Sequence, residues 1–105
     1  MELTISARAL LRMRRESYLL IDVRETALPP EGQRQGVLYR PYSQIEVWSR
    51  QLPRGKTIIC LCERGSLSLQ AAGRLRQLGF DARSVVGGSN LLERVEKQLA
   101  ESQTS

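Results

Sequence analysis

The chain has 105 residues, of which 41% are hydrophobic and 26% are charged, and it contains no histidine. This length fits one hydrophobic core, because two cores would each be too small, and the composition is too apolar for a disordered protein. The lack of histidine excludes Cys/His zinc sites and Ser/His or Cys/His nucleophile pairs. No apolar run approaches the roughly 18 residues that cross a bilayer. We therefore expect a cytosolic protein without a membrane contact.

The net charge of +5 favours anionic substrates or acidic partner proteins. The arginines are spread along the chain, and we expect Arg8, Arg12 and Arg15 to share one solvated face of the first helix. Nucleic acid is not an expected partner, since the sequence lacks clustered basic residues with interleaved aromatic residues.

The first third of the chain predicts a helix, a buried strand and a long irregular segment. Residues 7–15 have apolar positions at helical spacing, and Ser6 precedes them as an N-cap. The continuous apolar run 18–23 is typical of a strand buried on both faces, as in a parallel sheet. Residues 24–35 contain two prolines and a glycine, so we expect a loop there.

The middle of the chain predicts two strands with a short helix between them. Residues 36–39 can form a short strand, and the capping-box pattern of residues 43–46 opens a helix that ends near residue 51. Residues 57–62 are the strongest predicted strand of the sequence.

The last part of the chain predicts a helix over 68–78 with Gly79 as its cap, a strand over 83–86 and a second helix over 90–100. Leucines and small apolar residues at helical spacing should face the core: Leu69, Ala72, Leu75 and Leu78 in the first helix, and Leu91, Leu92, Val95 and Leu99 in the second. Residues 101–105 are expected to form a frayed tail.

Strands that alternate with helices predict an α/β domain over residues 1–100. Its centre should be a mostly parallel sheet of about five short strands flanked by helices, in three layers. Sites in such sheets form beyond the carboxyl ends of the strands, where both Asp22 and Cys62 fall. These two residues are therefore candidates for one site.

Cys62 lies where a buried strand passes into a loop before a helix. Successive backbone N–H groups in this geometry form an anion-binding nest at the positive end of the helix dipole, which favours a thiolate. A positive charge, a flexible glycine and two hydroxyl donors support that anion: Arg64, Gly65, Ser66 and Ser68. Glu63 opposes it unless its carboxylate points to solvent.

Cys60, inside the strand, fits the role of a small buried hydrophobic residue. We expect its side chain and that of Cys62 to point to opposite faces of the sheet, and both to be reduced thiols. Any cysteine chemistry is therefore assigned to Cys62.

Five segments carry a family pattern: Leu20–Glu25, Gly32–Val37 followed by Pro41, Cys62–Ser68, Leu78–Phe80 and Gly87-Gly88. In this order and spacing they resemble the single-domain rhodanese (sulfurtransferase) family, from about residue 4 to residue 96. The resemblance implies a rhodanese-like fold and an active-site loop that begins at Cys62.

The resemblance also implies ping-pong transfer of sulfane sulfur. The Cys62 thiolate would take sulfur from thiosulfate or another persulfide donor and hold it as a persulfide. It would then pass the sulfur to cyanide, glutathione or a protein thiol such as a thioredoxin-like one. Asp22 and Arg24 would form an ion pair that supports the loop, and no cofactor or metal is expected. The substrate-binding residues would be those of the loop: Glu63, Arg64, Gly65, Ser66, Leu67 and Ser68.

The sequence departs from the family pattern at three positions. Gln33 stands at the usual histidine position and Leu92 at that of a frequent tryptophan, and we expect both to change packing only. Leu67 stands where many members carry an arginine. Because it removes an anion-binding charge, we expect thiosulfate to bind poorly and a persulfide donor to be favoured.

Two other functions can be weighed against sulfur transfer. Phosphatases and arsenate reductases of the same fold need an arginine six positions after the cysteine to clamp an oxyanion, and that position is Ser68 here. The stronger alternative is a non-catalytic module that binds an acidic protein partner or senses redox state through Cys62.

Overall fold

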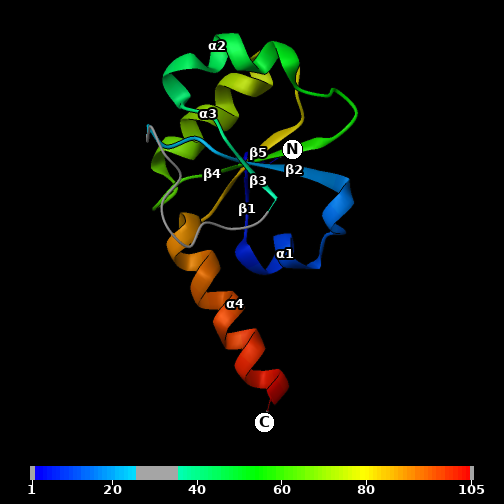
Figure 1. The fold of residues 1–105 in the computed structure, drawn as a ribbon, viewed down its shortest axis with the longest axis vertical. Coiled ribbons are helices and arrows are strands. Elements are labelled where there is room, and N and C mark those ends of the chain that lie inside the picture. The colour runs from blue at the N-terminus through cyan, green and yellow to red at the C-terminus, as the bar shows by residue number, and fades with distance from the viewer. Residues whose placement is uncertain (1, 26–35, 105) are drawn as a thin grey trace.

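The computed structural model describes residues 2–25 and 36–104 of the chain. One sheet of parallel strands has the order β1-β5-β4-β2-β3 (Figure 1). Its strands are β1 Thr4–Ile5, β2 Tyr18–Asp22, β3 Val37–Tyr39, β4 Thr57–Leu61 and β5 Ala82–Val85. The predicted α/β class with a parallel five-stranded sheet is confirmed.

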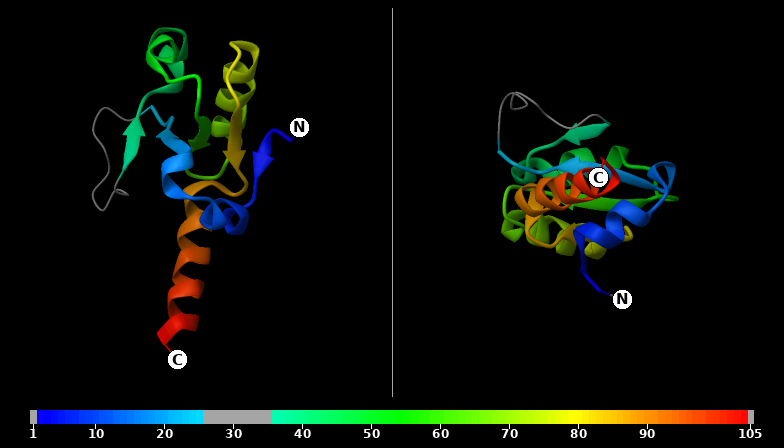
Figure 2. Two further views of the ribbon diagram at one scale, coloured as in Figure 1. Left: turned by 90° about the vertical axis from the view of Figure 1, so that its right-hand side faces the viewer. Right: turned by 90° about the horizontal axis from the view of Figure 1, so that it is seen from below.

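The helices lie on both faces of this sheet (Figure 2). Helices α2 and α3 cover one face, and α1 and α4 cover the other. Their bounds are α1 Ala7–Arg12, α2 Ile45–Trp48, α3 Ser66–Gln77 and α4 Gly88–Thr104, with 3₁₀ turns at Arg15–Ser17, Tyr42–Gln44 and Ser49–Gln51. Among the described residues, no helix is both long and apolar enough to cross a membrane.

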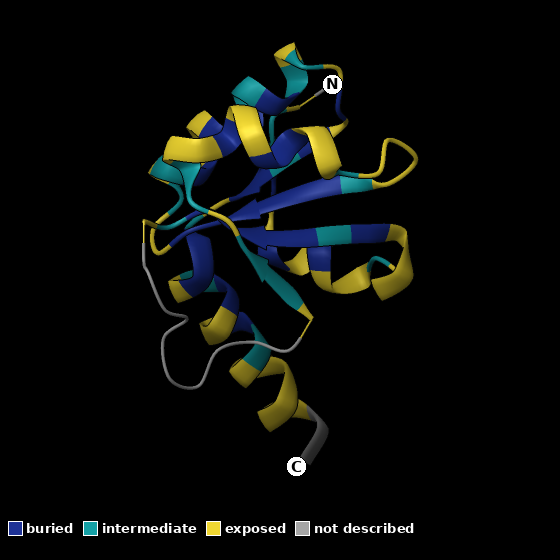
Figure 3. Ribbon diagram, turned by 45° about the horizontal axis from the view of Figure 1, so that its top comes forward, coloured by how far each residue is buried: buried dark blue, intermediate teal, exposed yellow. Residues whose placement is uncertain are grey.

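Alternation of side chains along β4 divides the hydrophobic core into two clusters. Ile58 and Cys60 pack with residues of α2 and α3, whereas Ile59 and Leu61 pack with residues of α1 and α4. The central strands are buried on both sides (Figure 3). This double burial explains why β2 and β4 appear in the sequence as continuous apolar runs.

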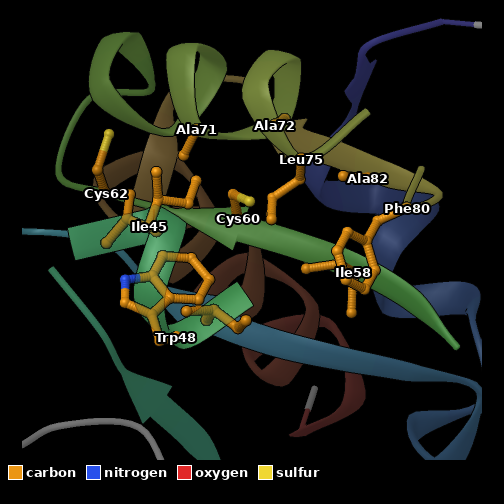
Figure 4. Close-up of a cluster of buried hydrophobic side chains, with 12 residues drawn as sticks. Ile45, Trp48, Ile58, Cys60, Cys62, Ala71, Ala72, Leu75, Phe80 and Ala82 are labelled. Carbon is orange, nitrogen blue, oxygen red and sulfur yellow. The ribbon is translucent and has the colours of Figure 1, made fainter. Parts of the chain in front are cut away.

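Cys60 and Cys62 lie on the same side of the sheet, below α3 (Figure 4). The expectation of opposite faces is wrong, because residues two apart along a strand share a face. Both cysteines are free thiols. Cys60 is fully enclosed by apolar neighbours, whereas Cys62 lies at the edge of that cluster, next to the loop.

The first helix is shorter than predicted, and a strand precedes it. Residues Thr4–Ile5 pair with β5, and α1 ends at Arg12. Ser6 caps α1 as predicted, with its Oγ accepting from the N–H of Ala9 at 3.1 Å. The prediction that Arg15 shares a helix face with Arg8 and Arg12 is wrong. Arg15 instead follows the helix and donates to the Gly36 carbonyl at 2.7 Å.

The capping-box prediction at residues 43–46 is also wrong. Both the N–H and the hydroxyl of Ser43 donate to the carboxylate of Glu25, at 2.6 and 2.8 Å. Glu46 forms an ion pair with Arg74 of α3 and therefore does not close a capping box. The carboxylate of Glu25 thus accepts the Ser43 N–H bond that was expected to go to the Glu46 side chain.

Two leucines that were expected to face the core are on the surface. Leu69 is 40% exposed and Leu99 is 37% exposed. Helix α3 begins at Ser66, two residues earlier than predicted, and its buried residues are Ser68, Ala71, Ala72 and Leu75. Helix α4 continues through Thr104, beyond the predicted start of a frayed tail at residue 101, because no glycine or proline stops it.

Most of the predicted loop over 24–35 lies outside the described residues, and so do Gly32 and Gln33. Leu92, at the family's tryptophan position, is 1% exposed and packs in the α1–α4 cluster. This burial is consistent with the packing role that we expect for Leu92.

Candidate active site

Cys62 directly follows β4, and its side chain lies at the beginning of α3 (Figure 4). Gly65 precedes the first residue of α3 with φ +104°, a left-handed conformation that L side chains rarely adopt. A Cβ at Gly65 would lie 3.3 Å from the Val85 carbonyl oxygen and 3.3 Å from the Gly87 nitrogen. Gly65 therefore lets the loop turn tightly around the sulfur.

The sulfur of Cys62 accepts hydrogen bonds from the backbone of its own loop. The N–H groups of Gly65 and Ser68 lie 3.1 and 3.2 Å from Sγ. The Ser68 hydroxyl oxygen is 3.3 Å from the same sulfur. This arrangement is the backbone nest that the sequence predicted, with α3 directed at the sulfur by its N-terminus.

The pKa of Cys62 is lowered from its ordinary value. Burial raises this pKa, but hydrogen bonds from the Ser68 hydroxyl and from the N–H groups of Ser68, Gly65 and Leu67 together outweigh burial. Burial raises the pKa of Cys60 to about 12. Of the two cysteines, Cys62 is therefore the one that ionises more readily.

Alkylation of the two cysteines should consequently depend on pH in different ways. Because the pKa of Cys62 is lowered, the midpoint of its rate profile should lie below the pKa of an ordinary thiol, near 8.5. Cys60 should not react while the protein is folded. Iodoacetamide labelling at a series of pH values, read by mass spectrometry of the two cysteine peptides, checks this. A Cys62 midpoint at or above that of a free thiol would contradict the account.

The beginning of α4 holds the other side of the loop backbone. The N–H groups of Ser89 and Asn90 donate to the carbonyl oxygens of Cys62 and Glu63, at 2.7 and 3.2 Å. Gly88 makes this approach possible, because a Cβ there would lie 2.4 Å from the Cys62 oxygen. The carbonyls thus point toward α4, which leaves the loop's N–H groups free to face the sulfur.

Asp22 and Arg24 form the expected ion pair next to the loop. Asp22 is 2% exposed, and its carboxylate accepts from Arg24 Nε at 3.0 Å and from Arg24 Nη2 at 2.6 Å. The backbone N–H of Arg24 also donates to Asp22. The Asp22 carboxylate raises the pKa of Arg24 by hydrogen bonding, so the guanidinium remains charged beside the site.

A surface pocket of about 280 Å³ opens beside Cys62. Two cations, one anion, one hydroxyl and one apolar side chain line it together with the sulfur: Arg24, Arg64, Glu63, Ser66 and Leu67. Because Asp22 pairs with Arg24, the pocket has less positive charge than its two arginines suggest. The half-buried Leu67 makes one wall apolar, as its sequence position predicted.

The structure therefore brings all of the predicted site residues together at one edge of the sheet. Two contributors were not singled out from the sequence: Ser84 of β5, which lies 2.7 Å from the Ser68 hydroxyl, and the N-terminal turn of α4. Sequence spacing alone could not identify these two contributors, because both are distant from Cys62 along the chain. Within the described residues, no group of three or more cysteines and carboxylates is arranged to hold a metal ion.

No protein-family model matches the chain, and no curated protein matches it. Solved structures do resemble it. A rhodanese-related protein from Thermoplasma volcanium has a TM-score of 0.79 and 27% identity, with 89% of this chain and 92% of that one covered. A rhodanese homolog from the extremely thermophilic bacterium Thermus thermophilus has a TM-score of 0.68 and 29% identity, with 85% and 99% covered.

The structure also resembles part of an NAD-dependent persulfide reductase from A. fulgidus, with a TM-score of 0.62 and 22% identity. The match covers 81% of this chain and 15% of that one, and it shows a shared fold.

The parallel sheet order, the two helical layers and the cysteine loop before α3 define the rhodanese-like class of α/β proteins. The chain shares the fold of these rhodanese-related structures.

Proposed function

We propose that the protein is a sulfurtransferase that carries sulfane sulfur as a persulfide on Cys62. The observation that supports this most is the pair of N–H donors, from Gly65 and Ser68, directed at a sulfur that lines an open pocket. Preorganised donors stabilise an anion at that position without a general base. This suits a protein that contains no histidine.

The reaction is a pair of displacements at sulfur that needs no oxidant or reductant. In the first, the Cys62 thiolate attacks the outer sulfur of a persulfide R–S–SH, the donor's S–S bond breaks, and R–S⁻ leaves as Cys62–S–SH forms. In the second, the acceptor, either a thiolate or cyanide, attacks the outer sulfur, the S–S bond of the persulfide breaks, and Cys62 leaves as a thiolate. The same N–H groups would stabilise the anion before and after each step.

The pocket favours a low-molecular-weight or protein persulfide over thiosulfate as the donor. Thiosulfate is a small dianion, and of the two arginines in the pocket Arg24 is already paired with Asp22. Glu63 adds a negative charge to the pocket lining, and Leu67 offers an apolar contact to the carbon chain of a persulfide. Cyanide, glutathione and thioredoxin-like proteins supply acceptors of the required kind.

Turnover with defined donors tests the proposal. The protein, given glutathione persulfide and cyanide, should release thiocyanate faster than it does with thiosulfate at equal concentration. Absence of transfer from every donor and to every acceptor would contradict a sulfurtransferase and favour a non-catalytic module.

Introducing an arginine at Leu67 should change the preference between donors. Leu67→Arg adds a cation to the pocket wall and should raise kcat/KM for thiosulfate by roughly fivefold to tenfold, with a smaller change for glutathione persulfide. Leu69→Arg is the matched control, because Leu69 is exposed on α3 and does not line the pocket. Equal gains in both variants would mean that overall charge, and not position 67, controls the donor.

A further inference from the structure

Ser84 is a buried polar residue in a mostly apolar sheet. It lies on β5, is 1% exposed, and pairs in register with Cys60 of β4. Its Oγ is 2.7 Å from the Ser68 hydroxyl and 3.4 Å from the Gly65 carbonyl oxygen. Ser84 thus contacts two residues that themselves contact the sulfur of Cys62.

The Ser68 hydroxyl has more neighbours than it can donate to. Its oxygen lies 3.3 Å from Cys62 Sγ, 3.1 Å from the Gly65 carbonyl and 2.7 Å from Ser84 Oγ. A hydroxyl has one hydrogen to donate and two lone pairs to accept with. The direction of that single hydrogen decides whether Ser68 stabilises an anionic sulfur.

The Gly65 carbonyl does not need the Ser68 hydrogen. It already accepts from the N–H of Leu69 at 3.0 Å, as a bond of the first turn of α3. Ser68 can therefore turn its hydrogen toward the sulfur without leaving that carbonyl unpaired. The Ser84 hydroxyl can at the same time donate to Ser68, which occupies a lone pair and polarises the Ser68 O–H.

We propose that Ser84 is a positioning residue that acts through Ser68: it donates to Ser68 Oγ and so directs the Ser68 hydrogen toward an anionic Cys62 sulfur. The anion is the thiolate in the resting protein. It is also the persulfide during transfer, and this second part rests on the proposed function. Only hydrogen bonds rearrange, and no covalent bond forms or breaks.

The charged groups around Cys62 lie on the pocket side of the sulfur, opposite Ser84. Arg24, Glu63 and Arg64 line the open pocket, whereas Ser84 reaches the sulfur from the buried side through Ser68. The neighbouring thiol of Cys60, with its pKa raised to about 12, stays protonated at neutral pH. Replacing Ser84 therefore leaves the other charges near the sulfur in place.

The test is the pH profile of Cys62 alkylation by iodoacetamide, read from the mass of the Cys62 peptide. Ser84→Ala should slow the reaction at neutral pH by roughly threefold to tenfold, and the midpoint of the profile should move to higher pH. Rates on the high-pH plateau should agree with the unmodified protein within about twofold, since there the thiol is ionised in both.

A double-mutant cycle tests whether Ser84 acts through Ser68. Because Ser84 acts on the sulfur only by way of Ser68, the Ser68→Ala/Ser84→Ala protein should react no more slowly than Ser68→Ala alone. Ser49→Ala, a change at another serine that is only 4% exposed, should leave the profile unchanged. Thermal unfolding checks that every variant is folded at the labelling temperature.

An unchanged Cys62 profile in Ser84→Ala, or effects of the two alanines that simply add, would overturn the assignment. Alkylation needs no sulfur donor, so this result is independent of whether the protein transfers sulfur. If no donor supports sulfur transfer, the proposed function is wrong, but the effect of Ser84 on the alkylation profile of Cys62 still stands.

Discussion

Replacing Cys62 with serine should abolish sulfur transfer, with a loss of at least about 10³-fold in turnover. The serine hydroxyl has nearly the size of the thiol and can accept from the same N–H groups of Gly65 and Ser68. It cannot form a persulfide, because it lacks a nucleophilic thiolate. The variant should therefore fold but not turn over. Thermal unfolding measures whether it folds, and an assay of thiocyanate release measures turnover.

Cys60→Ala is the matched control for that variant. Cys60 is 0% exposed within the cluster below α3, so its removal should lower the free energy of unfolding by about 1 kcal/mol. Its turnover should stay within about twofold of the unmodified protein, because Cys60 supplies no thiolate at neutral pH. Loss of turnover in Cys60→Ala with retention in Cys62→Ser would reverse the assignment of the reactive cysteine.

Gly88→Ala should be the most damaging glycine substitution for the loop. Gly88 has φ +64°, and an added Cβ would lie 2.4 Å from the Cys62 oxygen and 2.6 Å from the Glu63 carbonyl carbon. These are backbone atoms that cannot rotate away, so α4 would have to move off the loop. We expect the free energy of unfolding to fall by roughly 2–4 kcal/mol in chemical denaturation, and Cys62 to lose its fast alkylation at neutral pH.

Gly55→Ala separates this effect from the general cost of replacing a glycine. A Cβ at Gly55 meets nothing within 4 Å, and Gly55 is not among the glycines with positive φ. Its unfolding free energy should stay within about 0.5 kcal/mol of the unmodified protein. If Gly88→Ala were equally harmless, the contact between α4 and the loop would not position the sulfur.

The fold could largely be predicted because its signals are local. The continuous apolar runs that became β2 and β4 reflect burial on both faces, and Gly79, with φ +96°, ends α3 as its position predicted. The two-residue strand β1 was missed, because a strand of that length has no periodicity of its own. Its position depends on pairing with β5, which lies near the other end of the chain.

The candidate site was predictable where one short segment builds it. The stretch from Cys62 to Ser68 contains the thiol, the left-handed glycine and the first turn of α3, so its geometry follows from adjacent residues. Ser84 and the beginning of α4 could not be predicted, since both reach the loop only after the sheet has formed. The failed capping box has the same cause, because Glu25 meets Ser43 only in the folded chain.

Intact mass after incubation with a persulfide donor shows whether Cys62 holds transferred sulfur. We expect one added sulfur atom (about 32 Da) that dithiothreitol removes, present in the unmodified protein and in Cys60→Ala and absent in Cys62→Ser. An added sulfur that survives in Cys62→Ser, or no added sulfur from any donor, would contradict it.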